Sequence, residues 1–219
     1  MPLLGSPRRP EFDEYTIKFT VGAIALCLPW LEVALTKRTI NSISASFWYA
    51  DGVAPRTVFV GLLFAIGSLV FAYNGEDELE LVLGKLAALL AIAVALFPCA
   101  ECAPGISYRE IIPGVHSSSA ITLFAILAVF CIIFRHRAKD KIQKEPVHAP
   151  RRMWVYTVCC LGFVAAIALM VAYKVTQKEV FVLYAETTGL SSFGISWLTA
   201  SRVLPFLTSV AQRKQLFFR

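Results

Sequence analysis

The chain has 219 residues, of which 57% are hydrophobic, with a mean hydropathy of +0.65 and a formal net charge of +6. Soluble domains usually contain about 45–50% apolar residues, and the excess here is gathered in blocks, which excludes a soluble globular domain and predicts an integral membrane protein. The basic residues flank these blocks and form no compact basic face with interleaved aromatics, so we expect no nucleic-acid partner.

Six apolar segments are long enough to cross a hydrocarbon core about 30 Å thick as helices. They cover about residues 17–35, 57–73, 80–97, 117–134, 153–173 and 180–200. The sequence therefore predicts an all-α fold, a polytopic bundle of six transmembrane helices. The bundle spans residues 17–200, between an N-terminal segment at 1–16 and a basic tail at 201–219.

The first segment differs from a signal peptide. Its apolar run is too long for an ordinary signal core, and Thr36-Lys37-Arg38 follows it in place of a small-residue cleavage site. We interpret it as a retained helix, in which Pro29 predicts a kink.

The distribution of Lys and Arg predicts the orientation. The loop at 135–152 holds seven of them, whereas the loops on the opposite side hold six in total. Cytoplasmic loops carry the excess of basic residues, so we expect both termini in the cytoplasm and the protein in a bacterial inner membrane. The basic loop would also attract anionic lipid.

With this orientation, the out-of-place polar residues gather on the extracytoplasmic side. Glu186 lies about six residues into the last helix, roughly 8–9 Å below its outer end. A carboxylate at that depth is costly unless it is paired, protonated or in a wet cavity, so we expect a functional role. Glu32, at the outer end of the first helix, is interpreted as a solvated acid outside the site.

These residues predict a pocket that opens toward the outer surface. We expect Glu186 at its floor, with rim and wall residues from the outer loops: His116, Asp51, Arg56, Arg109, Ser42 and Ser44. A pocket at this level meets lipid headgroups first, and arginines suit phosphate. The sequence therefore predicts a protein that binds or handles a lipid headgroup, with membrane lipids as its partners.

Two further patterns have open interpretations. Small and hydroxylated residues after Glu186, from Thr187 to Ser196, predict a helix that packs closely against its neighbours. Cys99 and Cys102 form a C-x-x-C that fits either a redox pair or half of a zinc site. The sequence does not decide whether these two cysteines pair.

Several motifs carry a resemblance. They are the histidine that opens the fourth helix, His116, and the stretches Ser42-Ile43-Ser44-Ala45, Ala95-Leu96-Phe97-Pro98, Tyr184-Ala185-Glu186 and Phe193-Gly194-Ile195-Ser196-Trp197-Leu198. Over most of residues 15–202 the chain resembles uncharacterised bacterial six-helix membrane proteins. More distantly, it is similar to the damage-regulated autophagy modulator family and its relatives in GPI-lipid remodelling. Arg56 stands where that family usually has a glutamate. The resemblance implies a role in lipid handling.

Other functions remain open at this stage. A metal-assisted lipid hydrolase would use His116, Asp51 and Glu186 as metal ligands, because the other two histidines, His136 and His148, are predicted on the opposite side of the membrane. A serine nucleophile, Ser44 or Ser117, beside His116 is a second enzymatic hypothesis. An accessory subunit of a larger membrane complex, or a homo-oligomer, would also explain the close-packing last helix. No cofactor is identified.

Overall fold

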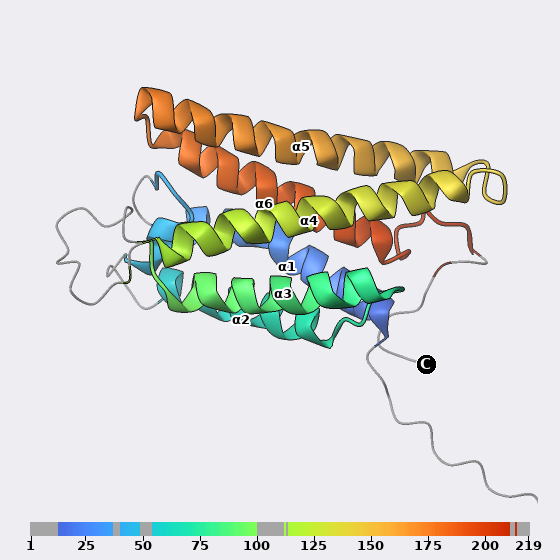
Figure 1. Cartoon of the computed structure of the whole chain (residues 1–219), viewed down its shortest axis with the longest axis horizontal. Coiled ribbons are helices and arrows are strands. Elements are labelled where there is room, and N and C mark those ends of the chain that lie inside the picture. The colour runs from blue at the N-terminus through green and yellow to red at the C-terminus, as the bar shows by residue number, and fades with distance from the viewer. Residues whose placement is uncertain are drawn as a thin grey trace, which may run out of the picture.

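The computed structural model describes residues 13–36, 40–48, 54–99, 112, 114–210 and 213. Every regular element in these ranges is helical, which confirms the all-α prediction (Figure 1). The elements are α1 (Glu14–Leu35), the short 3-10 helix η1 (Ser44–Phe47), α2 (Ala54–Ala72), α3 (Glu78–Leu96), α4 (Val115–Asp140), α5 (His148–Thr176) and α6 (Val180–Ala200).

The ends of the helices lie within a few residues of the ends of the predicted segments. The exceptions are the end of α4 and the start of α5, which both extend further into the basic loop between them. Side-chain caps define two of the starts. Asp13 accepts a hydrogen bond from the Thr16 N–H at 2.7 Å, and Asp77 accepts one from the Glu80 N–H at 2.9 Å. α1 continues through Pro29.

Successive long helices run in opposite directions, so the bundle has two distinct ends. At the connector end, which includes residues 40–48, α1, α3 and α5 finish and α2, α4 and α6 begin (Figure 1). At the terminal end, α1 begins and α6 finishes, and residues from both line one cavity. The described bundle therefore begins, at α1, and finishes, at α6, at the same end.

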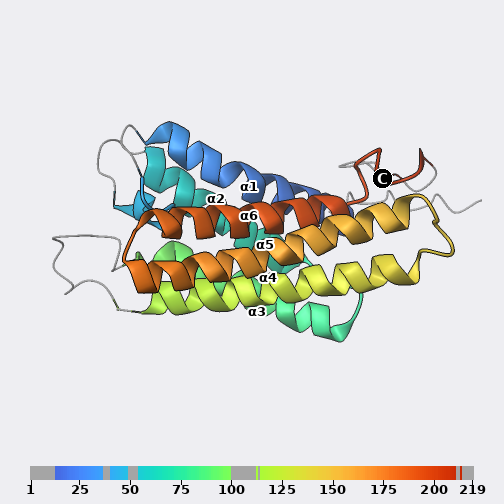
Figure 2. The ribbon, with the colours of Figure 1, turned by 90° about the horizontal axis from the view of Figure 1, so that it is seen from above.

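α6 packs between α1 and α5, as Figure 2 shows. Gly22 of α1 and Gly194 of α6 lie at the crossing of their helices. A Cβ built on Gly194 would stand 2.8 Å from the backbone oxygen of Gly22 and 2.8 Å from the backbone nitrogen of Leu26. The two backbones therefore meet at van der Waals distance, as the small residues of α6 predicted.

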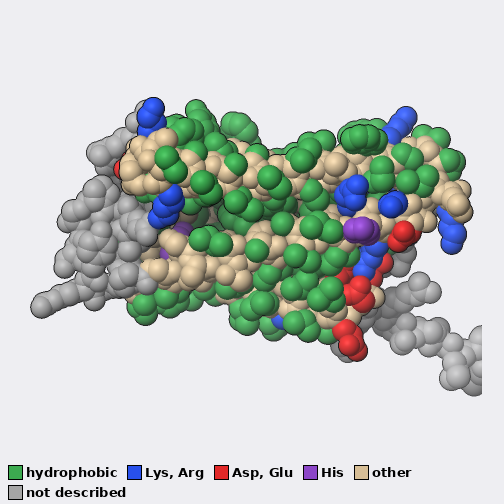
Figure 3. Space-filling view, turned by 45° about the horizontal axis from the view of Figure 1, so that its top comes forward, with side chains coloured by type: hydrophobic (Ala, Val, Ile, Leu, Met, Phe, Trp, Pro, Cys, Tyr) green, Lys and Arg blue, Asp and Glu red, His purple; other side chains and the backbone are tan. Residues whose placement is uncertain are grey.

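Five helices, α1 to α5, are long and apolar enough to cross a membrane by length and composition. α6, with 21 residues, is long enough but is not among these five helices, and it carries many small and hydroxylated residues. Because α1 and α5 pack on either side of α6, less of its surface would face lipid, and fewer apolar side chains are needed there. On the face in Figure 3, hydrophobic side chains cover the middle of the bundle and most charged side chains gather toward the terminal end.

The exposed face of α5 carries the clearest signature of a lipid environment. Large apolar side chains are more than half exposed along its length: Trp154, Val158, Leu161, Val164, Ile167, Val171 and Val175. Contiguous apolar exposure of this extent marks a membrane or protein contact. Together with the five long apolar helices, it defines the class of the chain as a helical integral membrane protein.

Candidate functional site

The Glu186 carboxylate lies inside the connector end, where the turn before η1 wraps around it. Oε1 accepts hydrogen bonds from the hydroxyls of Ser42 at 3.1 Å and Ser44 at 2.6 Å. The backbone N–H of Ile43 donates to Oε2 at 2.5 Å, and that of Ser44 donates to Oε1 at 3.4 Å. Charge-assisted bonds of this kind satisfy a carboxylate away from water. The predicted floor of the site and its two serines therefore meet.

His116 joins the same network from the first turn of α4. Its Nε2 lies 3.0 Å from the Ser44 hydroxyl, and its Nδ1 lies 2.8 Å from the carbonyl oxygen of Phe97. Because a carbonyl can only accept, Nδ1 carries a hydrogen and donates it to Phe97. Four distant parts of the chain thus form one line of hydrogen bonds: Phe97, His116, Ser44 and Glu186.

This line has two proton arrangements over the same heavy atoms. In the first, Nε2–H of His116 donates to Ser44 Oγ, which donates to an ionised Glu186. In the second, a protonated Glu186 donates to Ser44 Oγ, which donates to an unprotonated Nε2. A hydroxyl is both donor and acceptor, so Ser44 serves either case. A proton can therefore pass between Glu186 and His116 while every heavy atom stays in place.

Two further contacts hold residues 40–48 over the helix ends. The indole N–H of Trp48 donates to the carbonyl of Cys99 at 2.8 Å, and the side-chain amide of Asn41 donates to Glu179 at 2.7 Å. The first ties the connector to the end of α3 and the second ties it to the start of α6. The network therefore rests on three helices rather than on a free loop.

The remaining predicted residues fall outside this network or outside the described residues. Arg56 lies exposed at the start of α2, where its guanidinium carbon is 4.2 Å from the centroid of the Phe47 ring, a cation–π contact. Asp51, Arg109 and Cys102 lie outside the described residues. Cys99 is disulfide-bonded.

Glu32 corrects one interpretation of the sequence. It was expected to be a solvated acid, but its side chain is fully buried and neither carboxyl oxygen has a hydrogen-bond partner among the described residues. The neighbouring hydroxyl is that of Ser46, which is also buried. The expectation failed because η1, which is distant in sequence, folds back and places Ser46 beside the acid. A glutamate inside an apolar segment was the signal for a second buried carboxylate.

The described residues hold no group of three or more His, Cys, Asp or Glu side chains placed to bind a metal ion. Of the three proposed metal ligands, His116 and Glu186 are separated by Ser44, and Asp51 is not described.

Comparison of the chain with family models, with curated proteins and with solved structures finds no match. The class of the protein therefore rests on its fold and composition.

Proposed function

We propose that this chain is a six-helix integral membrane protein that binds a lipid headgroup at its connector end. The observation that carries the proposal is the line of hydrogen bonds from Glu186 through Ser44 to His116. A protein with a purely structural place in a bilayer has no need of a half-buried acid and hydroxyl joined in series to a buried imidazole, because each polar group is costly to remove from water. Their place at the helix ends is the level of lipid headgroups.

In this proposal the network shapes the site, and Arg56 contacts the ligand. Its guanidinium is exposed at the start of α2 and held over the Phe47 ring, where it can take a phosphate group bidentately. The sequence also predicts Asp51 and Arg109 at this rim, and both lie outside the described residues.

We also propose that the connector end faces away from the cytoplasm, with both termini inside. The basic loop between α4 and α5 lies at the terminal end, and basic loops stay in the cytoplasm. The disulfide at Cys99 lies at the connector end, and disulfides persist in oxidising compartments. Reporter fusions at each terminus test this: a reporter that is active only outside the cytoplasm should stay silent at both ends.

A photoreactive phospholipid in vesicles containing the full-length protein tests headgroup binding. Cross-links should map to the connector and the start of α2, and Arg56→Gln should lower their yield severalfold. Arg135→Gln is the control, because Arg135 bonds Thr157 near the terminal end. Equal cross-linking in both variants, or labelling spread evenly along the helices, would contradict the proposal.

A lipid hydrolase is a second candidate, because Ser44 Oγ lies within hydrogen-bond distance of His116 Nε2 and the Phe97 carbonyl orients the imidazole. This is the geometry of a nucleophile beside its base. Release of fatty acid or headgroup from a phospholipid by the wild type, and its loss in Ser44→Ala, would favour hydrolysis over binding.

An accessory subunit is the third candidate, since the apolar face of α5 fits a partner helix as well as lipid. A stoichiometric membrane partner that leaves with an α5 surface variant such as Val164→Ala would favour that function.

A further inference from the structure

A second polar cavity lies at the terminal end, far from the connector network along the helices. It has a volume of about 40 Å³ and is lined by residues from α1, α4, α5 and α6 and from the turn between α2 and α3. That volume accommodates several water molecules or a compact oxyanion such as a phosphate group. Basic side chains line it: Lys18, Arg137, Lys141, Arg152 and Arg202.

Three of these cations are already neutralised by carboxylates. Arg137 pairs with Glu76 at 3.5 Å and Asp77 at 2.9 Å and also bonds the buried Glu80. Lys18 lies 3.8 Å from Glu14, and Arg152 pairs with Glu145. These pairs fasten the helix ends to one another and have no need of a ligand.

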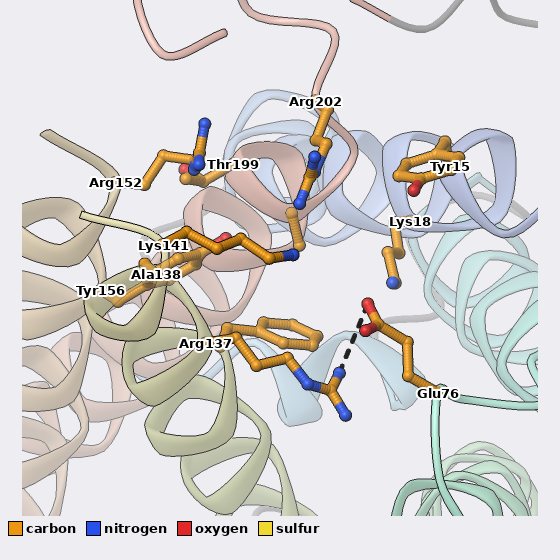
Figure 4. A pocket seen from close by; sticks show the side chains of 12 residues that line it. Tyr15, Lys18, Glu76, Arg137, Ala138, Lys141, Arg152, Tyr156, Thr199 and Arg202 are labelled. Atoms are coloured by element: carbon orange, nitrogen blue, oxygen red, sulfur yellow. Dashed lines mark ion pairs between the residues drawn. The ribbon is translucent and has the colours of Figure 1, made fainter. Parts of the chain in front are cut away.

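Lys141 and Arg202 differ from the other three. Among the residues that the structure describes, no carboxylate forms an ion pair with either side chain. Figure 4 shows both side chains pointing into the cavity and toward each other. Burial lowers the pKa of Lys141, and the charge of Arg202 lowers it further. The negative charges of Glu76 and Glu145, which are paired with other residues, raise this pKa. Two like charges thus face one polar cavity, and the nearby carboxylates, Glu76 and Glu145, form their ion pairs with Arg137 and Arg152 instead.

The backbone at Arg202 strengthens this observation. Arg202 follows the last residues of α6 with a φ of 55°, a left-handed conformation that usually belongs to glycine at this position after a helix. A glycine would end the helix at lower cost. Arg202 adopts this backbone, and its guanidinium points at the cavity (Figure 4).

We infer that this cavity binds a phosphate group, bridged between the ammonium of Lys141 and the guanidinium of Arg202. An oxyanion there would form the ion pair that neither cation has with a described carboxylate, and would accept hydrogen bonds from both cations. The cavity lies where the helices end, at the level of the membrane surface, so one source is the headgroup of an anionic phospholipid. The other source is free phosphate from solution.

Full-length protein purified in detergent tests the inference with two probes. Protein incubated with equimolar vesicles of phosphatidylcholine and phosphatidylglycerol should retain phosphatidylglycerol in native mass spectrometry. Inorganic phosphate at constant ionic strength should raise the thermal midpoint if the ligand is soluble. If the protein retains lipid and phosphate has no effect on the thermal midpoint, the ligand is the lipid headgroup. If phosphate raises the midpoint and no lipid is retained, the ligand is free phosphate.

Arg202→Gly and Lys141→Gln should each weaken binding of the effective probe about fivefold. The glycine variant suits the left-handed backbone, so weaker binding with an unchanged or raised midpoint separates ligand contact from misfolding. Lys144→Gln is the matched control, because Lys144 is exposed in the same loop, carries the same charge and does not line the cavity. Absence of binding by the wild type to both probes, or equal losses in all three variants, would overturn the inference.

Discussion

The hydroxyl oxygen of Ser44 lies 3.0 Å from Nε2 of His116, although 72 residues separate them along the chain. Ser44→Ala removes the only atom that joins this imidazole to Glu186 in the described line of hydrogen bonds. The buried imidazole and the half-buried carboxylate would each lose a partner, and we expect a loss of about 1–3 kcal/mol in the free energy of unfolding. Thermal unfolding in detergent measures it. Ser118→Ala is the control, since the Ser118 hydroxyl is exposed and bonds only its own helix at Val115.

The Glu186 carboxylate provides a second test. Glu186→Gln replaces one of the two acceptor oxygens with an NH2 donor. That donor would face the Ile43 N–H at the Oε2 position or the Ser44 N–H at the Oε1 position, so one of the two loses its bond. We expect a loss of about 2 kcal/mol in stability, the typical value for bonds to a charged group. Glu179→Gln changes another contact between the connector and α6, the exposed bond to Asn41, and should have little effect. Equal effects of the two changes would show that the hydrogen bonds to Glu186 contribute no more to stability than the exposed contact of Glu179.

Close packing of α1 on α6 predicts an asymmetric response to alanine. Gly194→Ala would place a methyl group 2.8 Å from two backbone atoms of α1, which cannot rotate away, and should cost about 1–3 kcal/mol. Gly61→Ala adds the same group where nothing lies within 4 Å, and should be neutral or slightly stabilising. The thermal unfolding midpoints of both variants, measured in the same detergent, test this difference. A harmless Gly194→Ala would mean that the helices are further apart than described.

Glu32 and Glu80 are both fully buried, yet their surroundings predict opposite effects of amidation. Glu80 accepts bonds from Tyr73, the Glu76 N–H and Arg137, so Glu80→Gln should destabilise the protein by about 2 kcal/mol. The Glu32 oxygens have no such donors among the described residues, so Glu32→Gln removes a desolvated acid and should be neutral or stabilising. Chemical denaturation of the two variants provides the comparison. Destabilisation by Glu32→Gln would reveal a partner for that acid.

The ion pair of Glu145 with Arg152 predicts a dependence on acid. Burial alone would raise the pKa of Glu145, but the hydrogen bond and charge of Arg152, with Arg202 and Lys141 nearby, lower it below its usual range. A lowered folded-state pKa means that the stabilisation is present in full above the unfolded value of 4.5 and is lost as the pH falls through the folded-state pKa. Stability measured from neutral to acid pH should fall less steeply in Glu145→Gln. Parallel curves would exclude this pair as a source of acid sensitivity.

Much of the architecture is readable from the chain itself. Six blocks of apolar residues predicted six helices close to their observed places, because hydropathy over about 20 residues is a local property. The small residues of α6 predicted close contact, and the Gly22–Gly194 crossing confirms it. A carboxylate deep in an apolar segment likewise marked Glu186 as unusual.

The partners of these groups were decided by the tertiary structure. Nothing local distinguishes Ser44, which joins Glu186 to His116, from Ser46, which lies beside Glu32. The Lys141–Arg202 cavity was missed because its residues belong to segments that meet only when α4 and α6 end side by side. The hydropathy and charge of a segment indicate the free-energy cost of burying that segment. Which group neutralises another depends on contacts between segments far apart in sequence, and only the packing of the bundle determines those contacts.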